Sequence, residues 1–150
     1  MLSKDLIYRI LDANLNRVTE GMRVCEEVAR FILNDRRLTA QFKSIRHRIF
    51  KVFVSLGRDE LIKKRKSRED VGRDLLRGEL KRSNYQDIFF ANMQRVKESM
   101  RVLEEFYKLI DKKAVIKLKR LRYHVYEIEK NVTLKLSALS GIRQRFLLPR

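Results

Sequence analysis

Two stretches of the chain carry the same polar side chains at the same spacing. The segment ANLNRVTEGMRVCEE, Ala13 to Glu27, recurs 78 residues later as ANMQRVKESMRVLEE, Ala91 to Glu105, and ten of the fifteen positions are identical. Each copy keeps an asparagine, an arginine three residues on and a glutamate three residues further on. An arginine guanidinium binds phosphate oxygens or carboxylates through paired N–H donors. The repeat therefore indicates phosphate binding or arginine–carboxylate pairing, present twice.

These polar residues fall inside the apolar stripe of each segment when it is drawn as a helix with about 100° per residue. The central positions are taken by Asn14, Arg17 and Gly21 in the first copy and by Asn92, Arg95 and Ser99 in the second. A buried charge without a partner costs several kcal/mol, so each arginine needs one. Because Gly21 and Ser99 are small, we expect two helix backbones, or a ligand, to approach closely there.

Two arrangements would satisfy the arginines. In the first, Arg17 pairs with Glu20 or with Glu98 of the other copy, Arg95 pairs reciprocally, and the pairs fix the helix register. In the second, both arginines bind phosphate oxygens of a ligand in a pocket between the two copies. A carboxylate-held arginine is also a preorganised phosphate clamp, so the two arrangements are compatible and both stay open.

Long helices must position these residues, and the sequence favours them. Apolar residues recur every three or four positions, and the 150 residues include only one proline and five glycines. The segment KSIRHRIF at 43–50 also resembles KRLRYHVY at 119–126. We therefore predict an all-α helical bundle built from two repeated long-helix αα-hairpins with pseudo-twofold symmetry. The predicted helices cover 6–34, 38–56, 85–110 and 111–136.

The whole chain is expected to form a single helical domain, 1–150. Within it, the sequence predicts repeat one at about 6–56, an irregular loop at about 57–84, repeat two at about 85–136 and a basic, loosely held tail at 137–150. Asn84 or Ser83 is expected to cap the third helix.

The charge of the chain favours anionic partners. Lys plus Arg is 36 and Asp plus Glu is 19, which gives a formal net charge of +17. Nucleic acid, a membrane surface or phosphorylated small molecules would all suit this charge. No window reaches the roughly 18 apolar residues of a membrane-spanning helix, and the first residues lack a signal-peptide core. We expect a cytoplasmic protein that does not enter a membrane.

Other candidate residues lie outside the two copies. Asp70 stands near Gly72 in the irregular loop, where a carboxylate could hold Mg²⁺, position a hydroxyl or form an ordinary turn. His47 follows Arg46 and could contact a phosphate or move a proton, although helical histidines are more often packed or exposed side chains. Cys25, the single cysteine, excludes an internal disulfide and a zinc site with several cysteines, and it is expected in the core.

Several standard catalytic motifs are absent from the sequence. It contains no GxxxxGK[ST] phosphate loop, no GxGxxG, and no HExxH, CxxC or GxSxG. Any catalysis must therefore use a less familiar set of residues.

Five segments, taken in order, resemble a known family. They are ILDANLNRVTEGMRVCEEVARFIL, IRHRIF, SREDVGRD, ANMQRVKESMRVLEEFYKL and LRYHVYEIEK, between about residues 7 and 132. Together they resemble the helical hydroxymethylpyrimidine-phosphate kinase domain that is often fused in front of thiamine-phosphate synthase. The resemblance implies transfer of a phosphoryl group from ATP, with Mg²⁺, to 4-amino-5-hydroxymethyl-2-methylpyrimidine phosphate. The product would be the diphosphate used in thiamine biosynthesis.

The implied chemistry suits a chain without an obvious general base. Phosphoryl transfer needs mostly positioning and neutralisation of charge. The acceptor in this reaction is a phosphate that is already ionised, so no strong base is required.

The resemblance also implies roles for individual residues. Catalytic roles are implied for Arg17, Arg95 and Asp70. Phosphate or pyrimidine contacts are implied for Asn14, Asn92, Arg23, Arg101, Arg46, His47 and Gly72. Carboxylates that would orient arginines or bind Mg²⁺ are Glu20, Glu27, Glu98 and Glu105. On the helical wheel, Arg23 and Arg101 lie off the central face, and the sequence does not define which residues bind a metal.

Two other functions fit the sequence. A basic helical module could bind nucleic acid, with an affinity that falls steeply as salt rises, through Lys112, Lys113, Lys117, Lys119, Arg120, Arg122 and the tail arginines Arg143, Arg145 and Arg150. That function would not explain why asparagine and arginine recur inside an apolar stripe. The third possibility is a non-catalytic partner of a thiamine biosynthetic enzyme. Expected partners are small-molecule phosphates, a separate thiamine-phosphate synthase and further copies of the chain in a homo-oligomer.

Overall fold

The fold consists of four long helices, and the connection before the third of them is much longer than the other two. The computed structural model describes residues 2–74 and 80–147 of the chain. Its long helices are α1 (Lys4–Glu27), α2 (Arg36–Val52), α4 (Tyr85–Tyr107) and α5 (Lys112–Leu147), and α3 (Arg58–Lys63) is a short one. A π-helical turn η1 (Val28–Ile32) extends α1, and 3₁₀ turns η2 (Val54–Leu56) and η3 (Ser67–Glu69) flank α3. The described residues contain no strand, so the predicted all-α class is confirmed.

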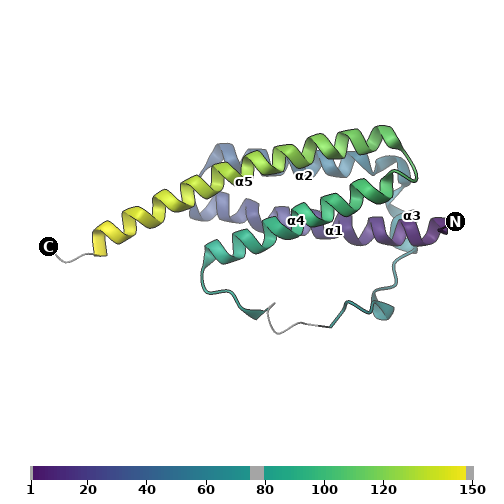
Figure 1. Cartoon of the computed structure of the whole chain (residues 1–150), viewed down its shortest axis with the longest axis horizontal. Coiled ribbons are helices and arrows are strands. Elements are labelled where there is room, and N and C mark those ends of the chain that lie inside the picture. The colour runs from purple at the N-terminus through teal and green to yellow at the C-terminus, as the bar shows by residue number, and fades with distance from the viewer. Residues whose placement is uncertain (1, 75–79, 148–150) are drawn as a thin grey trace.

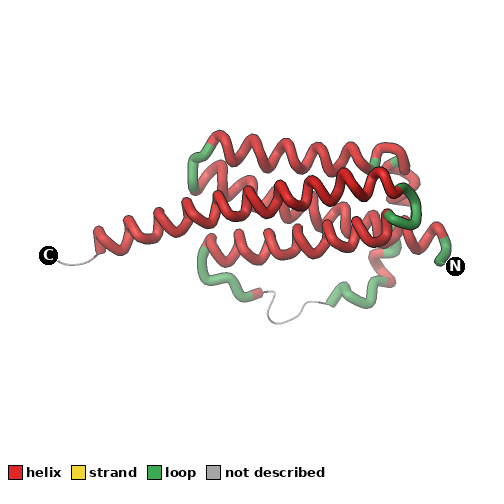
Figure 2. Tube along the Cα trace, turned by 45° about the horizontal axis from the view of Figure 1, so that its top comes forward, coloured by secondary structure: helices red, strands yellow, loops and turns green. Residues whose placement is uncertain are grey.

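The four long helices form a bundle. Helix α1 packs against α2 and α4, and α5 packs against the same two helices, so the order around the bundle is α1, α2, α5, α4 (Figure 1). Residues 64–74, which follow α3, run along the outside of this bundle (Figure 2). The two copies of the sequence repeat lie on α1 and α4, which pack directly against each other. The pseudo-twofold axis between the two hairpins stays a prediction.

Side-chain caps set the helix starts. The Asn84 side chain accepts a hydrogen bond from the Asp87 amide at 2.9 Å, which confirms it as the cap of α4. Asp35 caps α2 in the same way, accepting from the Leu38 amide at 2.9 Å. Asn34, just before it, has a φ of 49°, a left-handed conformation that asparagine tolerates and that ends the first helix.

The last helix is longer than its pattern predicted. The sequence indicated an end near Leu136 and a loosely held tail, whereas α5 continues to Leu147. Residues 137–147 contain one glycine and no proline, so nothing in them breaks a helix. The Gln86 side chain of α4 donates to Ser140 Oγ at 2.6 Å, which ties the start of this extension to the bundle. Beyond it, α5 projects past the other helices (Figure 1).

The core contains the apolar stripes that the sequence predicts. Met22 and Cys25 of α1 and Met93 and Met100 of α4 are fully buried between the repeats. Burial raises the pKa of the Cys25 thiol, so this cysteine stays protonated and unreactive near neutral pH. None of the described helices combines the length and the apolarity that crossing a membrane requires.

Gly21 allows α1 and α4 to approach closely. A Cβ atom at this position would lie 2.8 Å from Val96 Cγ2 and 3.2 Å from the Asn92 carbonyl oxygen. Gly21→Val is therefore expected to lower the free energy of unfolding by about 1–3 kcal/mol through overpacking, measured by urea denaturation. Gly141→Ala is the control, because a Cβ atom added at Gly141 would meet no neighbouring group within 4 Å. That change should leave stability unaltered or slightly raised, and an unaltered stability of the Gly21→Val protein would contradict the close packing.

Candidate functional site

A cavity of about 650 Å³ opens between α1 and α4, and the duplicated polar residues line it. Its walls are formed by Asn14, Arg17, Glu20 and Gly21 of α1, by Asn92, Arg95, Glu98, Ser99 and Val102 of α4, and by Gly72 of the loop after α3. The spacing of three and four residues puts each set on one face of its helix. The structure thus brings both copies of the repeat to a single site, hereafter the α1–α4 cavity.

The two asparagines are held by their own helices. Asn14 Nδ2 donates to the Ile10 carbonyl oxygen at 2.9 Å, and Asn92 Nδ2 donates to the Ile88 carbonyl oxygen at 2.8 Å. Each bond spans four residues, so both side-chain amides are fixed in the same way in both repeats. Asn14 is buried, and its Oδ1 accepts a hydrogen bond of 3.5 Å from Arg17. The amides therefore present fixed dipoles to the cavity.

Arg17 and Arg95 are exposed, not buried as the helical wheel suggested. Both arginines line the cavity. The part of the apolar stripe where they lie therefore faces an opening between the helices and not the core. Arg17 forms no ion pair with Glu20 or Glu98 within the described part of the chain. Glu98 instead accepts a hydrogen bond from Gln94 at 2.9 Å. Guanidinium groups at a polar opening are suited to binding an anion from solvent.

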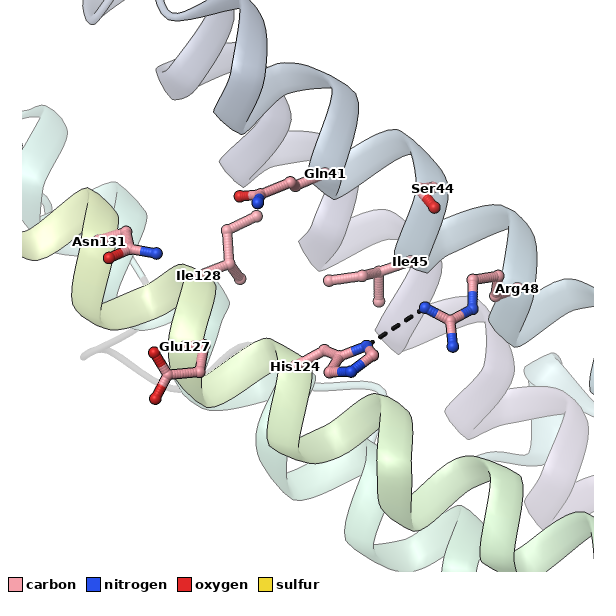
Figure 3. Close-up of a pocket in the computed structure, with 8 residues that line it drawn as sticks. All are labelled: Gln41, Ser44, Ile45, Arg48, His124, Glu127, Ile128 and Asn131. Carbon is pink, nitrogen blue, oxygen red and sulfur yellow. Dashed lines mark hydrogen bonds between the residues drawn. The ribbon is translucent and has the colours of Figure 1, made fainter.

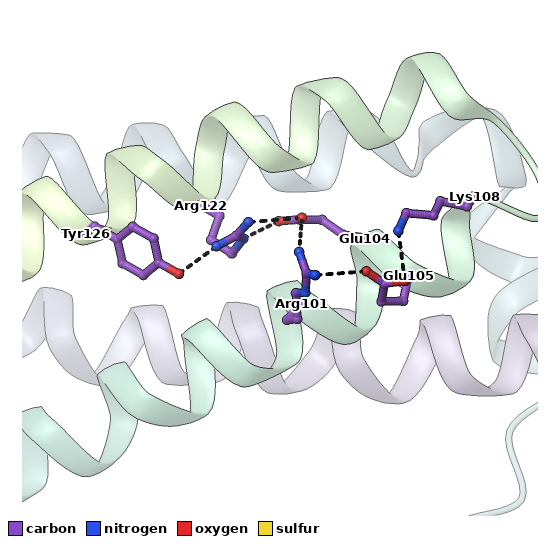
Figure 4. A network of polar contacts seen from close by, with 6 residues as sticks. All are labelled: Arg101, Glu104, Glu105, Lys108, Arg122 and Tyr126. Atoms are coloured by element: carbon purple, nitrogen blue, oxygen red, sulfur yellow. Dashed lines mark hydrogen bonds and ion pairs between the residues drawn. The ribbon is translucent and has the colours of Figure 1, made fainter.

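Two buried glutamates that the sequence did not single out organise the other arginines. Glu104 is 2% exposed and accepts hydrogen bonds from Arg101 of its own helix, at 3.4 Å, and from Arg122 of α5 (Figure 4). Arg122 also donates to the Tyr126 hydroxyl oxygen at 2.6 Å. The hydrogen bonds from Arg122 to Glu104 raise the pKa of Arg122, which keeps the pair ionised. This network joins α4 to α5.

The first repeat contains the same arrangement. Glu26 is 3% exposed and accepts from Arg46 of α2 at 3.0 Å and from Arg23 of α1 at 3.4 Å. Arg46 and Arg122 occupy equivalent places in the two similar segments at 43–50 and 119–126. The sequence contains a signal for these networks. Each half repeats an arginine in its second helix, and that arginine lies opposite a glutamate repeated in the first helix.

These networks account for several residues to which the resemblance gave substrate contacts. Arg23, Arg46 and Arg101 pair with the buried glutamates and do not line the α1–α4 cavity. Glu27 pairs with Arg23 at 3.0 Å and Glu105 with Arg101 at 3.3 Å and Lys108 at 2.8 Å, all on helix surfaces. His47 is exposed on α2, and it too is absent from the wall of the cavity.

A smaller cavity of about 330 Å³ adjoins the first one beside α1. It is lined by Arg9, Asp12, Ala13, Asn16 and Glu20 of α1 and by Arg65, Lys66, Ser67 and Asp70 of the loop after α3. Glu20 lines both cavities. Asp70 accepts a hydrogen bond from the Gly72 amide at 2.9 Å, so the two loop residues named from the sequence form one turn that borders both. Of the residues in this wall, Glu20 and Asp70 are among the site residues predicted from the sequence.

An ion pair anchors the loop to α1. Arg65 donates to both carboxylate oxygens of the buried Asp12, at 2.7 and 2.8 Å. The hydrogen bond to Asp12 raises the pKa of Arg65, so this guanidinium keeps its charge. A bidentate pair fixes orientation as well as distance. The loop is therefore held where Gly72 and Asp70 reach the two cavities.

The two cavities contain carboxylate oxygens that could bind Mg²⁺. The described residues contain no group of three or more His, Cys, Asp or Glu side chains that could hold a metal ion alone. Mg²⁺ is usually bound by one or two carboxylates together with substrate phosphates. Glu20, Glu98 and Asp70 line the two cavities and fit that type of binding.

A further cavity lies across the bundle between α2 and α5. It measures about 310 Å³, and Figure 3 shows the residues that line it: Gln41, Ser44, Ile45, Arg48, His124, Glu127, Ile128 and Asn131. Arg48 Nη1 lies 3.2 Å from His124 Nδ1, which accepts its hydrogen bond. None of the residues proposed from the sequence as a site lines this cavity.

Comparison with known proteins gives the relationships of the chain. A model described as the ThiD2 family matches residues 9–131. Thiamine-phosphate synthase of Nostoc sp. is 39% identical over 130 residues, covering 86% of this chain and 36% of the relative. Thiamine-phosphate synthase of Synechocystis sp. is 41% identical over 128 residues, covering 85% of this chain and 36% of the relative. No solved structure matches.

A third relative matches over a similar share of its length. Thiamine-phosphate synthase of Rhodopirellula baltica is 35% identical over 136 residues, covering 90% of this chain and 36% of that protein. The chain thus spans about a third of the length of these curated relatives. The family match covers both cavity-forming helices and the loop between them. The chain belongs to the ThiD2 family.

Proposed function

We propose that this protein is a phosphotransferase of thiamine biosynthesis that converts 4-amino-5-hydroxymethyl-2-methylpyrimidine phosphate to the diphosphate, with ATP as the donor. The observation that carries the proposal is the α1–α4 cavity, where both copies of the asparagine–arginine–glutamate set meet. The relationship to thiamine-phosphate synthases supports the pathway. A protein that joins two phosphate groups needs two phosphate contacts at one place, and the proposal assigns them to Arg17 and Arg95, which both line the cavity.

The reaction requires positioning more than proton transfer. An oxygen of the acceptor phosphate attacks the γ-phosphorus of ATP and forms the new P–O bond. The bond from that phosphorus to the oxygen bridging the β- and γ-phosphates breaks, and its electron pair leaves with ADP. The second pKa of a phosphate monoester is about 6, so the acceptor is largely a dianion at neutral pH and needs no base. Bound Mg²⁺ would neutralise charge on the phosphates.

The residues of the cavity have distinct tasks in this proposal. Arg17 and Arg95 hold phosphate oxygens, since a guanidinium fork matches that geometry. The fixed amides of Asn14 and Asn92 offer polar contacts to the phosphates or the pyrimidine. Glu98 can accept from the pyrimidine amino group or contribute to Mg²⁺ binding. The partner expected to consume the diphosphate is thiamine-phosphate synthase.

Turnover tests the proposal. Purified protein incubated with the pyrimidine monophosphate, ATP and Mg²⁺ is expected to produce diphosphate and ADP in equal amounts, followed by ³¹P NMR. Omission of either substrate is the control, because ATP consumption without the pyrimidine would indicate a different reaction. A protein that binds both substrates yet forms no diphosphate would contradict catalysis and favour a non-catalytic role.

A second function is favoured by a basic surface on the opposite side of the bundle. A cavity of about 230 Å³ between α2 and α5 is lined by Arg48, Lys51, Val52, Lys117, Arg120 and Leu121, with no carboxylate among them. Such a surface suits nucleic acid. Arg122, which the sequence placed in this basic stripe, is instead buried against Glu104. Titration with duplex DNA at two salt concentrations separates this function from binding of the pyrimidine phosphate.

A further inference from the structure

The two repeats contribute equivalent residues to the α1–α4 cavity, but their surroundings differ. The smaller cavity beside α1 is lined by Arg9, Asp12 and Asn16 of the first repeat. Seventy-eight residues later, the equivalent positions of the second repeat are Asp87, Phe90 and Gln94. The positive charge of Arg9 and the Asp12 anchor for Arg65 therefore occur only beside α1. The centre of the site, the α1–α4 cavity, is built by both repeats. The smaller cavity beside α1, hereafter the charged flank, is built by the first repeat and the loop after α3.

The charged flank is continuous with the centre of the site. Glu20 lines both cavities, and the Asp70–Gly72 turn contributes one residue to each. A ligand that fills the smaller cavity would therefore reach the α1 side of the larger one. Arg17 is the arginine on that side, whereas Arg95 lies on α4.

We propose that the smaller cavity binds the α- and β-phosphates of the nucleoside triphosphate donor, with the donor's γ-phosphate at Arg17 and the acceptor's phosphate at Arg95. This inference rests on the proposed function and assigns its two substrates to opposite halves of the site. A donor with three phosphates needs more cationic contacts than an acceptor with one. The flank beside α1 supplies them.

Three cations carry the proposed contact with the donor. Arg9 is half-buried and donates to the Lys66 carbonyl oxygen at 3.4 Å, so it lies against the loop that forms the opposite wall. Arg65 is oriented by its two hydrogen bonds to Asp12. Lys66 is largely exposed, and its ion pair with Glu69 is 3.8 Å long and solvent-exposed, so its flexible side chain can leave that pair and follow a bound phosphate. A donor phosphate bound here would gain charge-assisted hydrogen bonds from all three groups.

Carboxylates at the junction fit the ion that accompanies a nucleoside triphosphate. Glu20 stands between the cavities, and Asp70 lines the smaller one. One or two carboxylates together with phosphate oxygens are the usual ligands of Mg²⁺. On the other half, the position equivalent to Asp12 is Phe90, which is 42% exposed. Phe90 carries no charge and lines neither cavity, so the α4 half has no counterpart of the ion pair between Asp12 and Arg65.

The assignment is tested with the full chain and three probes: a non-hydrolysable ATP analogue with Mg²⁺, inorganic triphosphate and the pyrimidine monophosphate. The double variant Arg9→Ala/Lys66→Ala should bind the analogue and the triphosphate at least about tenfold more weakly, because two charge-assisted contacts are lost. It should bind the pyrimidine monophosphate within about twofold of the unaltered protein. The ion pair of Arg65 with Asp12 is left intact, so the buried carboxylate keeps its partner.

A matched control is available on α3. Arg58→Ala/Lys63→Ala removes the same charge from positions that line neither cavity. This variant should bind all three probes as the unaltered protein does. Circular dichroism and thermal melting of both variants show whether they fold alike.

The possible results separate this inference from the proposed function. Unaltered affinity of Arg9→Ala/Lys66→Ala for the analogue would overturn the donor assignment and leave the proposed function standing. An equal loss of affinity for the analogue and for the pyrimidine monophosphate would also overturn it, because one cavity would then serve both. Absence of pyrimidine monophosphate binding in the unaltered protein would reject the proposed function itself.

Discussion

Replacing Glu104 with alanine is expected to lower the free energy of unfolding by about 3–5 kcal/mol, the range for removing one partner of a buried ion pair. The side chains of Glu104 and Arg122 are only 3% and 11% exposed. Without the carboxylate, the Arg122 guanidinium keeps its charge in a place that water hardly reaches. The Tyr126 hydroxyl would be its remaining polar contact among those described. The loss should appear as a lower urea midpoint with an unchanged slope.

The neighbouring glutamate is the control for this prediction. Glu105→Ala removes a carboxylate from the same turn of α4, but the Glu105 side chain is 44% exposed and pairs with surface residues. Exposed pairs contribute about 0–1 kcal/mol, so the stability should change little. Equal effects of the two substitutions would contradict the structural role assigned to the Glu104 network. In the first repeat, Glu26→Ala is the equivalent of Glu104→Ala, and Glu27→Ala is its control.

Replacing Arg95 with alanine is expected to weaken binding of the pyrimidine monophosphate by roughly 10–100-fold, since hydrogen bonds to charged groups are worth about 1.5–3 kcal/mol. Arg95 is exposed and lines the α1–α4 cavity. Its removal should therefore change the stability by no more than about 0.5 kcal/mol. Isothermal titration measures the first quantity and urea denaturation the second.

Lys108→Ala is the matched control for Arg95→Ala. It removes one positive charge from just beyond the end of α4, where Lys108 pairs with Glu105 outside the cavity. Its affinity for the pyrimidine monophosphate should match that of the unaltered protein. Retention of tight binding by Arg95→Ala would remove Arg95 from the site, and a similar loss in Lys108→Ala would show that binding depends only on overall charge.

The fold was largely predictable because local signals agree with one another. The spacing of apolar residues defined α2, α4 and the combined span of α1 and η1 to within about four residues, and Asn84 was recognisable as a cap from its residue type and place. The end of α5 was missed because the apolar stripe fades after Leu136, while helix formation needs only the absence of breakers. Packing on a neighbour decides such cases, and Gln86, which contacts Ser140, lies 54 residues away in the sequence.

The centre of the site was predictable for a different reason. The repeat shows that Asn14 and Arg17 occupy the same positions in the first copy as Asn92 and Arg95 in the second. The packing of α1 against α4 brings these residues together. The charged flank was not predictable, because Arg9 and Arg65 are 56 residues apart and are not repeated. Only the fold of the loop onto α1 shows that they share a cavity.

Titration calorimetry of the unaltered protein with 4-amino-5-hydroxymethyl-2-methylpyrimidine phosphate is the decisive measurement of whether the α1–α4 cavity binds a phosphorylated pyrimidine. We expect saturable binding with one site per chain and a dissociation constant in the micromolar range, which corresponds to a binding free energy of about −8 kcal/mol. Inorganic phosphate at the same concentration should bind far more weakly, because it lacks the ring. No heat and no thermal shift with the pyrimidine phosphate would show that the cavity does not bind this ligand. Arg17 and Arg95 would then line a cavity that serves another ligand.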